Sequence, residues 1–198
     1  MQVRQLWSRS RVYRIVLVVA LVYTALRLIV HGAYLGIMLY PSSNLMGGMP
    51  EWTGSEGNPL VPVDLQIYLD AAERFLERRP LYLRSNRIEI YQYPPFYAFA
   101  FIPFTHLPRV ATVIIHSLLH VGAYALLYVT WDRIFSQLGF DRVRGMLAWT
   151  LPVWLIFSSF WSDLSYLNIY VVMALLGSSF VAAILKERLG WSVFWLTL

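Results

Sequence analysis

The chain has 198 residues, of which 58% are hydrophobic and 14% are charged, and its mean hydropathy is +0.54. This composition is too apolar for a water-soluble domain and is typical of a protein that crosses a lipid bilayer. Cysteine is absent, which excludes disulfides and thiolate metal sites. The net charge of +5 indicates loop topology and contact with acidic headgroups in such a protein, and it does not indicate nucleic-acid binding.

The first predicted span covers residues 13–38, and four arginines lie within the first fourteen residues, at or before its start. Because basic residues stay in the cytoplasm, the N-terminus is predicted there. The apolar run is too long for the core of a signal peptide, so we interpret it as a signal anchor. Arg27 lies near its outer end, where a charge suggests a functional partner. The alternative is that Arg27 snorkels to the surface or pairs with a carboxylate.

An outer loop is predicted over residues 40–94, and its first part is rich in glycine, proline and serine. From Asp64 to Arg79 the apolar residues recur at helical spacing, which predicts an amphipathic helix lying along the membrane surface. Asp64 opens this helix. It is interpreted either as an N-cap, for which aspartate is a preferred residue, or as a functional carboxylate held at the membrane interface.

Residues 95–107 form an apolar run that is too short for a straight span, so it predicts a short or re-entrant segment. Tyr91, Tyr93 and Tyr97 lie at its start, and an interfacial aromatic belt is one explanation for them. The pair Pro94–Pro95 suits an extended approach followed by the first turn of a helix.

Further spans are predicted over residues 110–131, 146–160 and 169–185, and residues 191–198 begin another. The stretch "WSDLSYLN" is predicted as a polar break on the outer side. If residues 95–107 re-enter, the inner segments carry four, three and two basic residues and the outer break carries none, as the positive-inside rule requires. His116 and His120 lie one helical turn apart, and because no carboxylate lies on their own segment to complete a metal site, they are interpreted as structural or hydrogen-bonded histidines.

Two segments, "VDLQIYLDAAERFLERRPLY" and "YQYPPFYAFAFIPFTHLP", resemble glycosyltransferase family 87, whose membrane fold is called GT-C. The resemblance covers about residues 63–185. The residues that match the family pattern are Asp64, Tyr68, Ala71, Ala72, Pro80, Tyr82, Tyr91, Tyr93, Pro94, Pro95, Pro103, Leu107 and Pro108. The implied fold class is all-α, a polytopic helical membrane protein with a GT-C-like N-terminal core and an amphipathic surface helix in the first outer loop.

The resemblance implies transfer of a mannose-like sugar from a polyprenyl-phosphate donor to a hydroxyl of a lipid or glycan acceptor, on the outer face of the plasma membrane. Asp64 takes the role of the general base, with inversion at the anomeric carbon. One carboxylate suffices because a leaving phosphate needs no proton. Residues expected to bind substrate are Tyr68, Tyr93, Arg27, His106 and Asn168, of which Asn168 matches a family Gly-Gln-x-Asn pattern whose Gln is absent here.

No cofactor is expected, and no metal-ligating residues are assigned. The role of a divalent metal stays open, because the outer loop has acidic residues but no Asp-x-Asp pair. The alternative function is a non-catalytic membrane subunit or lipid-docking scaffold. A small transporter would need a polar pathway that the spans hardly offer. Because the last apolar run stops after eight residues, we expect a truncated or N-terminal part of a family member.

Overall fold

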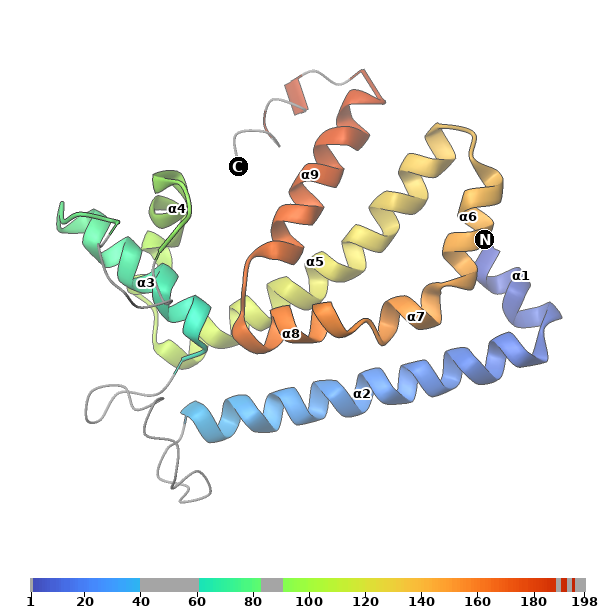
Figure 1. The fold of residues 1–198 in the computed structure, drawn as a ribbon, viewed down its shortest axis with the longest axis horizontal. Coiled ribbons are helices and arrows are strands. Elements are labelled where there is room, and N and C mark those ends of the chain that lie inside the picture. Colours follow the sequence, from blue (N-terminus) through green and yellow to red (C-terminus); the bar gives the residue numbers. More distant parts are fainter. Residues whose placement is uncertain (1, 40–60, 83–90, 188–189, 192–193, 195–198) are drawn as a thin grey trace. The chain divides into compact units, whose positions relative to one another are not determined.

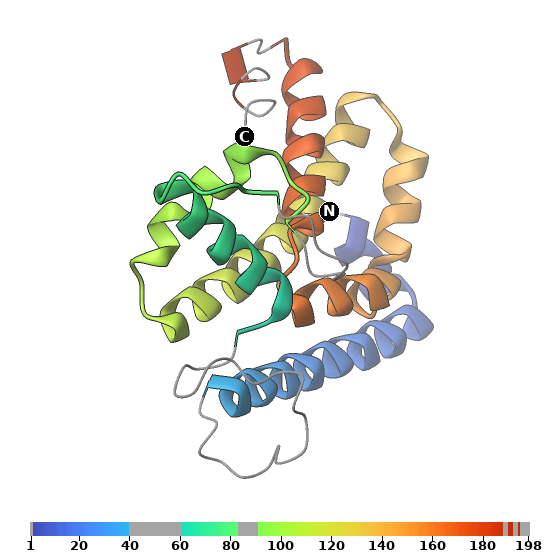
Figure 2. The same cartoon turned by 60° about the vertical axis from the view of Figure 1, so that its left-hand side comes forward.

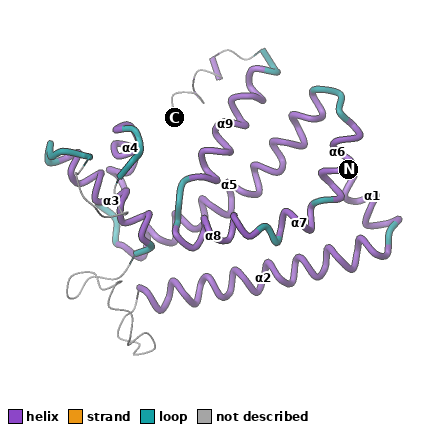
Figure 3. Tube along the Cα trace, in the orientation of Figure 1, coloured by secondary structure: helices purple, strands orange, loops and turns teal. Residues whose placement is uncertain are grey.

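The computed structural model describes residues 2–39, 61–82, 91–187, 190–191 and 194, and all regular structure within these ranges is helical (Figure 3). The prediction of an all-α protein is therefore confirmed. Figure 1 labels the helices, which in chain order are α1 (Gln2–Arg9), α2 (Arg11–Leu39), α3 (Val63–Leu76), α4 (Pro95–Thr105), α5 (Arg109–Gln137), α6 (Asp141–Trp149), α7 (Leu151–Leu155), α8 (Ser158–Tyr166) and α9 (Tyr170–Ile184).

The chain divides into two compact units. Unit 1 comprises Met1–Val30, Leu119–Asp163 and Ile169–Leu198, and unit 2 comprises His31–Leu118 and Leu164–Asn168. Each unit is described by itself.

Two helices of the described chain are long and apolar enough to cross a bilayer, Arg11–Ile37 and Arg109–Gln137, with mean hydropathies of 2.2 and 1.8. At about 1.5 Å per residue each is ~40 Å long, which exceeds the ~30 Å hydrocarbon thickness. Only 11% of the first helix's apolar window is buried against other parts of the chain, so its surface suits lipid. The protein is therefore a helical integral membrane protein. The membrane borders proposed for the individual spans stay predictions.

In the region of the predicted span 146–160 the structure has three helices, α6, α7 and α8, which together are long and apolar enough for one broken span or a re-entrant loop. The chain bends by 52° between α6 and the α7–α8 segment. Pro152 lies in the first turn of α7, where its missing N–H costs nothing and favours a new helix start. The predicted polar break was wrong in its extent, since α8 continues to Tyr166 and only the following residues form the turn.

Unit 1 joins these helices through side chains that bond to backbone carbonyls. The Tyr13 hydroxyl of α2 donates to the Ala148 carbonyl of α6 at 2.7 Å, and Tyr13 is buried. Between α5 and α6, Gly139 has a φ of 72°, the left-handed conformation that commonly ends a helix. Arg144 then forms ion pairs with Asp132 and Asp141, so the predicted charged connector is a short turn between two helices.

In unit 2, α3 packs against α4, and the two helices lie side by side in Figures 1 and 2. Pro95 starts α4 at a position where proline is favoured, and α4 ends at Thr105 after eleven residues. The face of α3 that packs inward is small or apolar and fully buried; it comprises Leu65, Tyr68, Leu69, Ala71 and Ala72. Alanines allow close approach of the two helix backbones, so α4 supports the element that carries Asp64.

Leu65→Ala should lower the free energy of unfolding by about 2–5 kcal/mol, because the Leu65 side chain is fully buried and its loss leaves a cavity. The matched control is Leu76→Ala on the same helix, where the leucine is 47% exposed and the change should stay within about 0.5 kcal/mol. Titration with a denaturing detergent, followed by tryptophan fluorescence, measures both values. Equal effects of the two changes would contradict the packing described for α3.

Candidate active site

Asp64 lies in the first turn of α3, and it is not the N-cap of this helix. The helix begins at Val63, and the N-cap residue is Pro62, with a non-helical φ of −51° and ψ of 140°. No side chain caps the helix by a hydrogen bond. The N-cap interpretation was therefore wrong by two positions. The Asp64 carboxylate therefore does not cap the helix and can bond to another side chain. Its position in the first turn of the helix still favours a negative charge.

That interaction is a hydrogen bond with the side chain of Asn168, which follows α8. Asn168 Nδ2 donates to Asp64 Oδ2 at 2.8 Å. Both residues belong to unit 2 and both are partly exposed, so the carboxylate stays within reach of solvent. The proximity of these two predicted site residues is a long-range feature, since 104 positions separate them in the sequence.

Two tyrosine hydroxyls fix the orientation of the Asn168 amide. The Tyr68 hydroxyl donates to Asn168 Oδ1 at 3.0 Å, and the Tyr93 hydroxyl lies 3.3 Å from the same oxygen. The two hydroxyls are themselves 3.2 Å apart. With its oxygen occupied by phenols, the Asn168 amide can only point its N–H group at Asp64. Four of the predicted site residues, Asp64, Tyr68, Tyr93 and Asn168, therefore form one network, named here the Asp64 network.

Aromatic rings hold the Tyr68 side of this network in place. Tyr68 is buried and contacts the rings of Tyr93, Tyr97 and Phe101, with centroids between 5.1 and 5.3 Å apart. The contacts with Tyr93 and Tyr97 are edge-to-face, an arrangement that aromatic pairs favour. Tyr91 adds a further bond, because its hydroxyl donates to the carbonyl of Pro94 at 2.6 Å. The "YQYPP" stretch therefore packs against α3.

Burial raises the pKa of Asp64 above its ordinary value, and the hydrogen bond from Asn168 lowers it in part. A carboxylate with a raised pKa is a stronger base than one in open water. Burial also raises the pKa of Tyr68, helped by its contact with Tyr93, and it raises the pKa of Tyr91 to about 12. Tyr68 therefore remains a neutral hydrogen-bond donor while Asp64 changes its charge.

The other two predicted site residues lie outside the Asp64 network. His106 is exposed and ends α4 as its C-cap. Arg27 belongs to unit 1, where its guanidinium lies 5.4 Å from the centroid of the Trp161 ring, a cation–π contact. This contact is a partner that the sequence analysis did not consider for Arg27.

The two histidines of α5 have separate surroundings. The ring of His116 is buried and packs against Phe101 and Phe104 in unit 2. In unit 1, His120 Nε2 lies 3.7 Å from Asp163 Oδ2, and this oxygen also accepts a bond from the Val171 N–H. Both histidines are packed within the fold, as their structural interpretation expects. Within the described part of the chain, no group of three or more His, Cys, Asp or Glu residues could hold a metal ion.

The sequence analysis did not predict that Tyr97 and Phe101 contact the site residue Tyr68. Tyr97 was assigned only to the membrane interface, and Phe101 was not singled out. Their spacing of four residues, placed directly after Pro95 at the start of a helix, was the available signal, because residues four apart share a helix face.

Fold and site together define a helical membrane protein with a carboxylate bonded to an amide, whose oxygen accepts bonds from two phenols. A comparison with protein-family models gives a match to glycosyltransferase family 87 over residues 91–198, more than half of the chain. The chain belongs to this family, as its sequence motifs indicate, and it is a glycosyltransferase with a sugar donor and an acceptor as substrates. The matched residues include Tyr93 and Asn168 but begin after Asp64. No curated protein and no solved structure matches the chain.

Asn168→Ala should move the acidic limb of the pH–rate profile for sugar transfer to higher pH. If Asp64 is the general base, as the family resemblance implies, it works only when deprotonated, and the rate falls as the pH falls through its pKa. Loss of the Asn168 N–H removes the group that lowers this pKa, and the pKa therefore rises further. Initial rates measured across the pH range, with Ser162→Ala on the exposed face of α8 as control, test this. A limb that stays in place or moves to lower pH would contradict it.

Proposed function

We propose that this chain transfers a mannose-like sugar from a polyprenyl-phosphate donor to a hydroxyl of a lipid or glycan acceptor, with Asp64 as general base. The observation that carries the proposal is the position of Asp64. Its carboxylate is oriented by Asn168, has a raised pKa, and lies in a partly exposed site of a membrane glycosyltransferase. Family membership supports sugar transfer, and the donor, the sugar and the base are the proposed parts.

The reaction needs only one carboxylate. The acceptor oxygen forms a bond to the anomeric carbon, the bond from that carbon to the phosphate oxygen breaks, and the acceptor proton passes to Asp64. The polyprenyl phosphate departs with the bonding electrons and needs no proton, unlike the alcohol expelled in glycoside hydrolysis. Attack and departure on opposite faces of the sugar invert the anomeric configuration.

The environment of Asp64 fits this role in two respects. Its partner is a neutral amide, so the carboxylate is oriented without the strong depression of pKa that an arginine would cause. Tyr68 and Tyr93 hold the Asn168 oxygen through their hydroxyls, so the amide keeps its N–H group directed at the carboxylate. In this proposal both tyrosines and Asn168 line the substrate site, and Arg27 and His106 are further residues for contacts with the donor phosphate.

A lipid-linked donor also sets where the site must be. The proposal puts the N-terminus in the cytoplasm, the spans in the plasma membrane in a GT-C-like arrangement, and residues 95–107 in a re-entrant segment. Asp64 then lies on the outer face, at a depth where the sugar on a polyprenyl phosphate can reach it. An apolar α4 of eleven residues is compatible with re-entry, because it is too short for a straight span.

Asp64→Asn should lower the rate of sugar transfer by about 10²–10⁴-fold, the usual contribution of a positioned base. The assay follows radiolabel from polyprenyl-phosphate mannose into acceptors in membranes that contain the full chain, and a parallel reaction uses polyprenyl-phosphate glucose. Glu77→Gln is the matched control, because Glu77 is exposed just after α3 and pairs with Arg79, and its rate should stay within about twofold.

Two outcomes would contradict the proposal. If Asp64→Asn transfers sugar as fast as the unchanged chain, Asp64 is not the base. If neither donor gives transfer with the unchanged chain while both bind, the donor class is wrong.

A further inference from the structure

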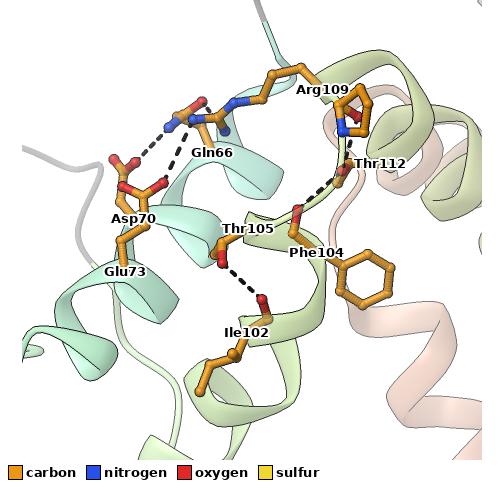
Figure 4. A network of polar contacts seen from close by, with 9 residues as sticks. Gln66, Asp70, Glu73, Ile102, Phe104, Thr105, Arg109 and Thr112 are labelled. Atoms are coloured by element: carbon orange, nitrogen blue, oxygen red, sulfur yellow. Dashed lines mark hydrogen bonds and ion pairs between the residues drawn. The ribbon is translucent and has the colours of Figure 1, made fainter.

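A second polar cluster joins side chains of α3 to the start of α5 (Figure 4). It consists of Gln66, Asp70 and Glu73 together with Arg109, the first residue of α5. Arg109 Nη1 donates to Gln66 Oε1 at 3.3 Å, and Arg109 Nη2 lies 3.9 Å from Glu73 Oε1. Gln66 Nε2 in turn donates to Asp70 Oδ1. We name this cluster the Arg109 clamp.

The clamp and the Asp64 network occupy different faces of one helix. Consecutive residues of an α-helix are about 100° apart around its axis, so Gln66 lies about 200° from Asp64. Tyr68, by contrast, lies one turn from Asp64 and points to the same network. The Arg109 clamp therefore contacts a different side of α3 from the side that carries the Asp64 network.

The first turn of α5, which carries Arg109, is itself held in place by Thr112. Thr112, one turn after Arg109, is fully buried, and its hydroxyl lies 3.3 Å from the Phe104 carbonyl and 3.4 Å from the Pro108 carbonyl. The contact with Phe104 ties the first turn of α5 to the end of α4. Because α3 also packs on α4, the three helices form a closed set of contacts in which Arg109 supplies the link from α5 back to α3.

The buried face of α3, which includes Leu65, Tyr68 and Leu69, holds the helix from one side. The Arg109 guanidinium contacts a partly exposed side of α3, at Gln66 and Glu73, two residues separated by two turns. A contact that spans two turns adds a further restraint on rotation of α3 about its axis. Since the clamp residues are partly exposed, such contacts add little to stability, and their main effect is on orientation.

We propose that Arg109 is a positioning residue for the general base: through Gln66 and Glu73 it fixes the rotation of α3, and thereby the direction of the Asp64 carboxylate. This inference rests on the proposed function, in which Asp64 takes the acceptor proton. Among the residues that the structure describes, the phenols of Tyr68, Tyr93 and Tyr97 are titratable groups that pack on the Asp64 side of α3. The charges of the clamp lie on the other side, so Arg109 acts on Asp64 through geometry.

Arg109→Gln should lower kcat about tenfold while KM for the donor changes less than about twofold, because a small misplacement of a catalytic group lowers the rate of the chemical step. The melting temperature should stay within about 2 °C of that of the unchanged chain. Arg109→Lys should give an intermediate kcat, since lysine keeps the charge but cannot contact both partners with a planar fork. Arg133→Gln is the matched control, an exposed arginine of the same helix that lies in unit 1, and its kcat should be unchanged.

Two further measurements separate positioning from a general structural effect. Rotation of α3 lengthens the Asp64–Asn168 bond, so the acidic limb of the pH–rate profile should move to higher pH in Arg109→Gln, as in Asn168→Ala. The double variant Arg109→Gln, Glu73→Gln should lose no more rate than Arg109→Gln alone, because both changes break the same contact.

The outcomes distinguish this inference from the proposed function. An unchanged kcat and pH profile in Arg109→Gln, alongside an inactive Asp64→Asn, would overturn the positioning role and leave the base in place. A loss of rate that only matches the loss of folded protein would also overturn it. An active Asp64→Asn would remove the base itself, and with it the residue that Arg109 is proposed to position.

Discussion

The hydrogen bond between Asp64 and Asn168 is the interaction on which the proposed chemistry depends. A half-buried carboxylate needs a polar partner, because its charge loses hydration. An arginine partner would stabilise the anion strongly and make it a weak base. An amide satisfies one oxygen and leaves the effect of burial dominant, so the pKa of Asp64 remains raised. The choice of a neutral partner therefore gives both orientation and basicity, which a charged partner cannot give together.

Within the Asp64 network, aromatic rings hold Tyr68 in place, and the Asn168 amide links the two tyrosine hydroxyls to the carboxylate. Tyr68 takes part in both kinds of contact. Its ring packs among Tyr93, Tyr97 and Phe101, and its hydroxyl donates a hydrogen bond to Asn168. A tyrosine has only two side-chain torsions, so burying its ring fixes the hydroxyl at small cost in conformational entropy. The aromatic stretch before and within α4 therefore does more than anchor the chain at an interface, because the same rings orient the polar atoms of the site.

The sequence predicted the elements better than their ends, and individual site residues better than their contacts. The long apolar runs of α2 and α5 have one stable conformation in lipid, so periodicity and length suffice for them. The helix boundaries in the α6–α8 region were not predicted from the sequence. The stretch that follows Phe160 looks polar, but Trp161 and Leu164 lie at helical spacing within it and are buried in α8. The bond between Asp64 and Asn168 could not be derived from local pattern, since it joins segments 104 positions apart. Only the family motifs connected those two residues.

The turn that carries Asn168 illustrates how tertiary burial outweighs local preference. Leu167 has a φ of 52°, a left-handed conformation that costs a residue with a β-carbon about 1–2 kcal/mol. Its side chain is fully buried, which contributes on the order of 1.5–3 kcal/mol and offsets that cost. Glycine would accept the same backbone without strain, but it would lose the apolar contact and leave the turn free to move. A buried leucine therefore fixes the direction in which the chain leaves α8, and with it the position from which Asn168 reaches Asp64.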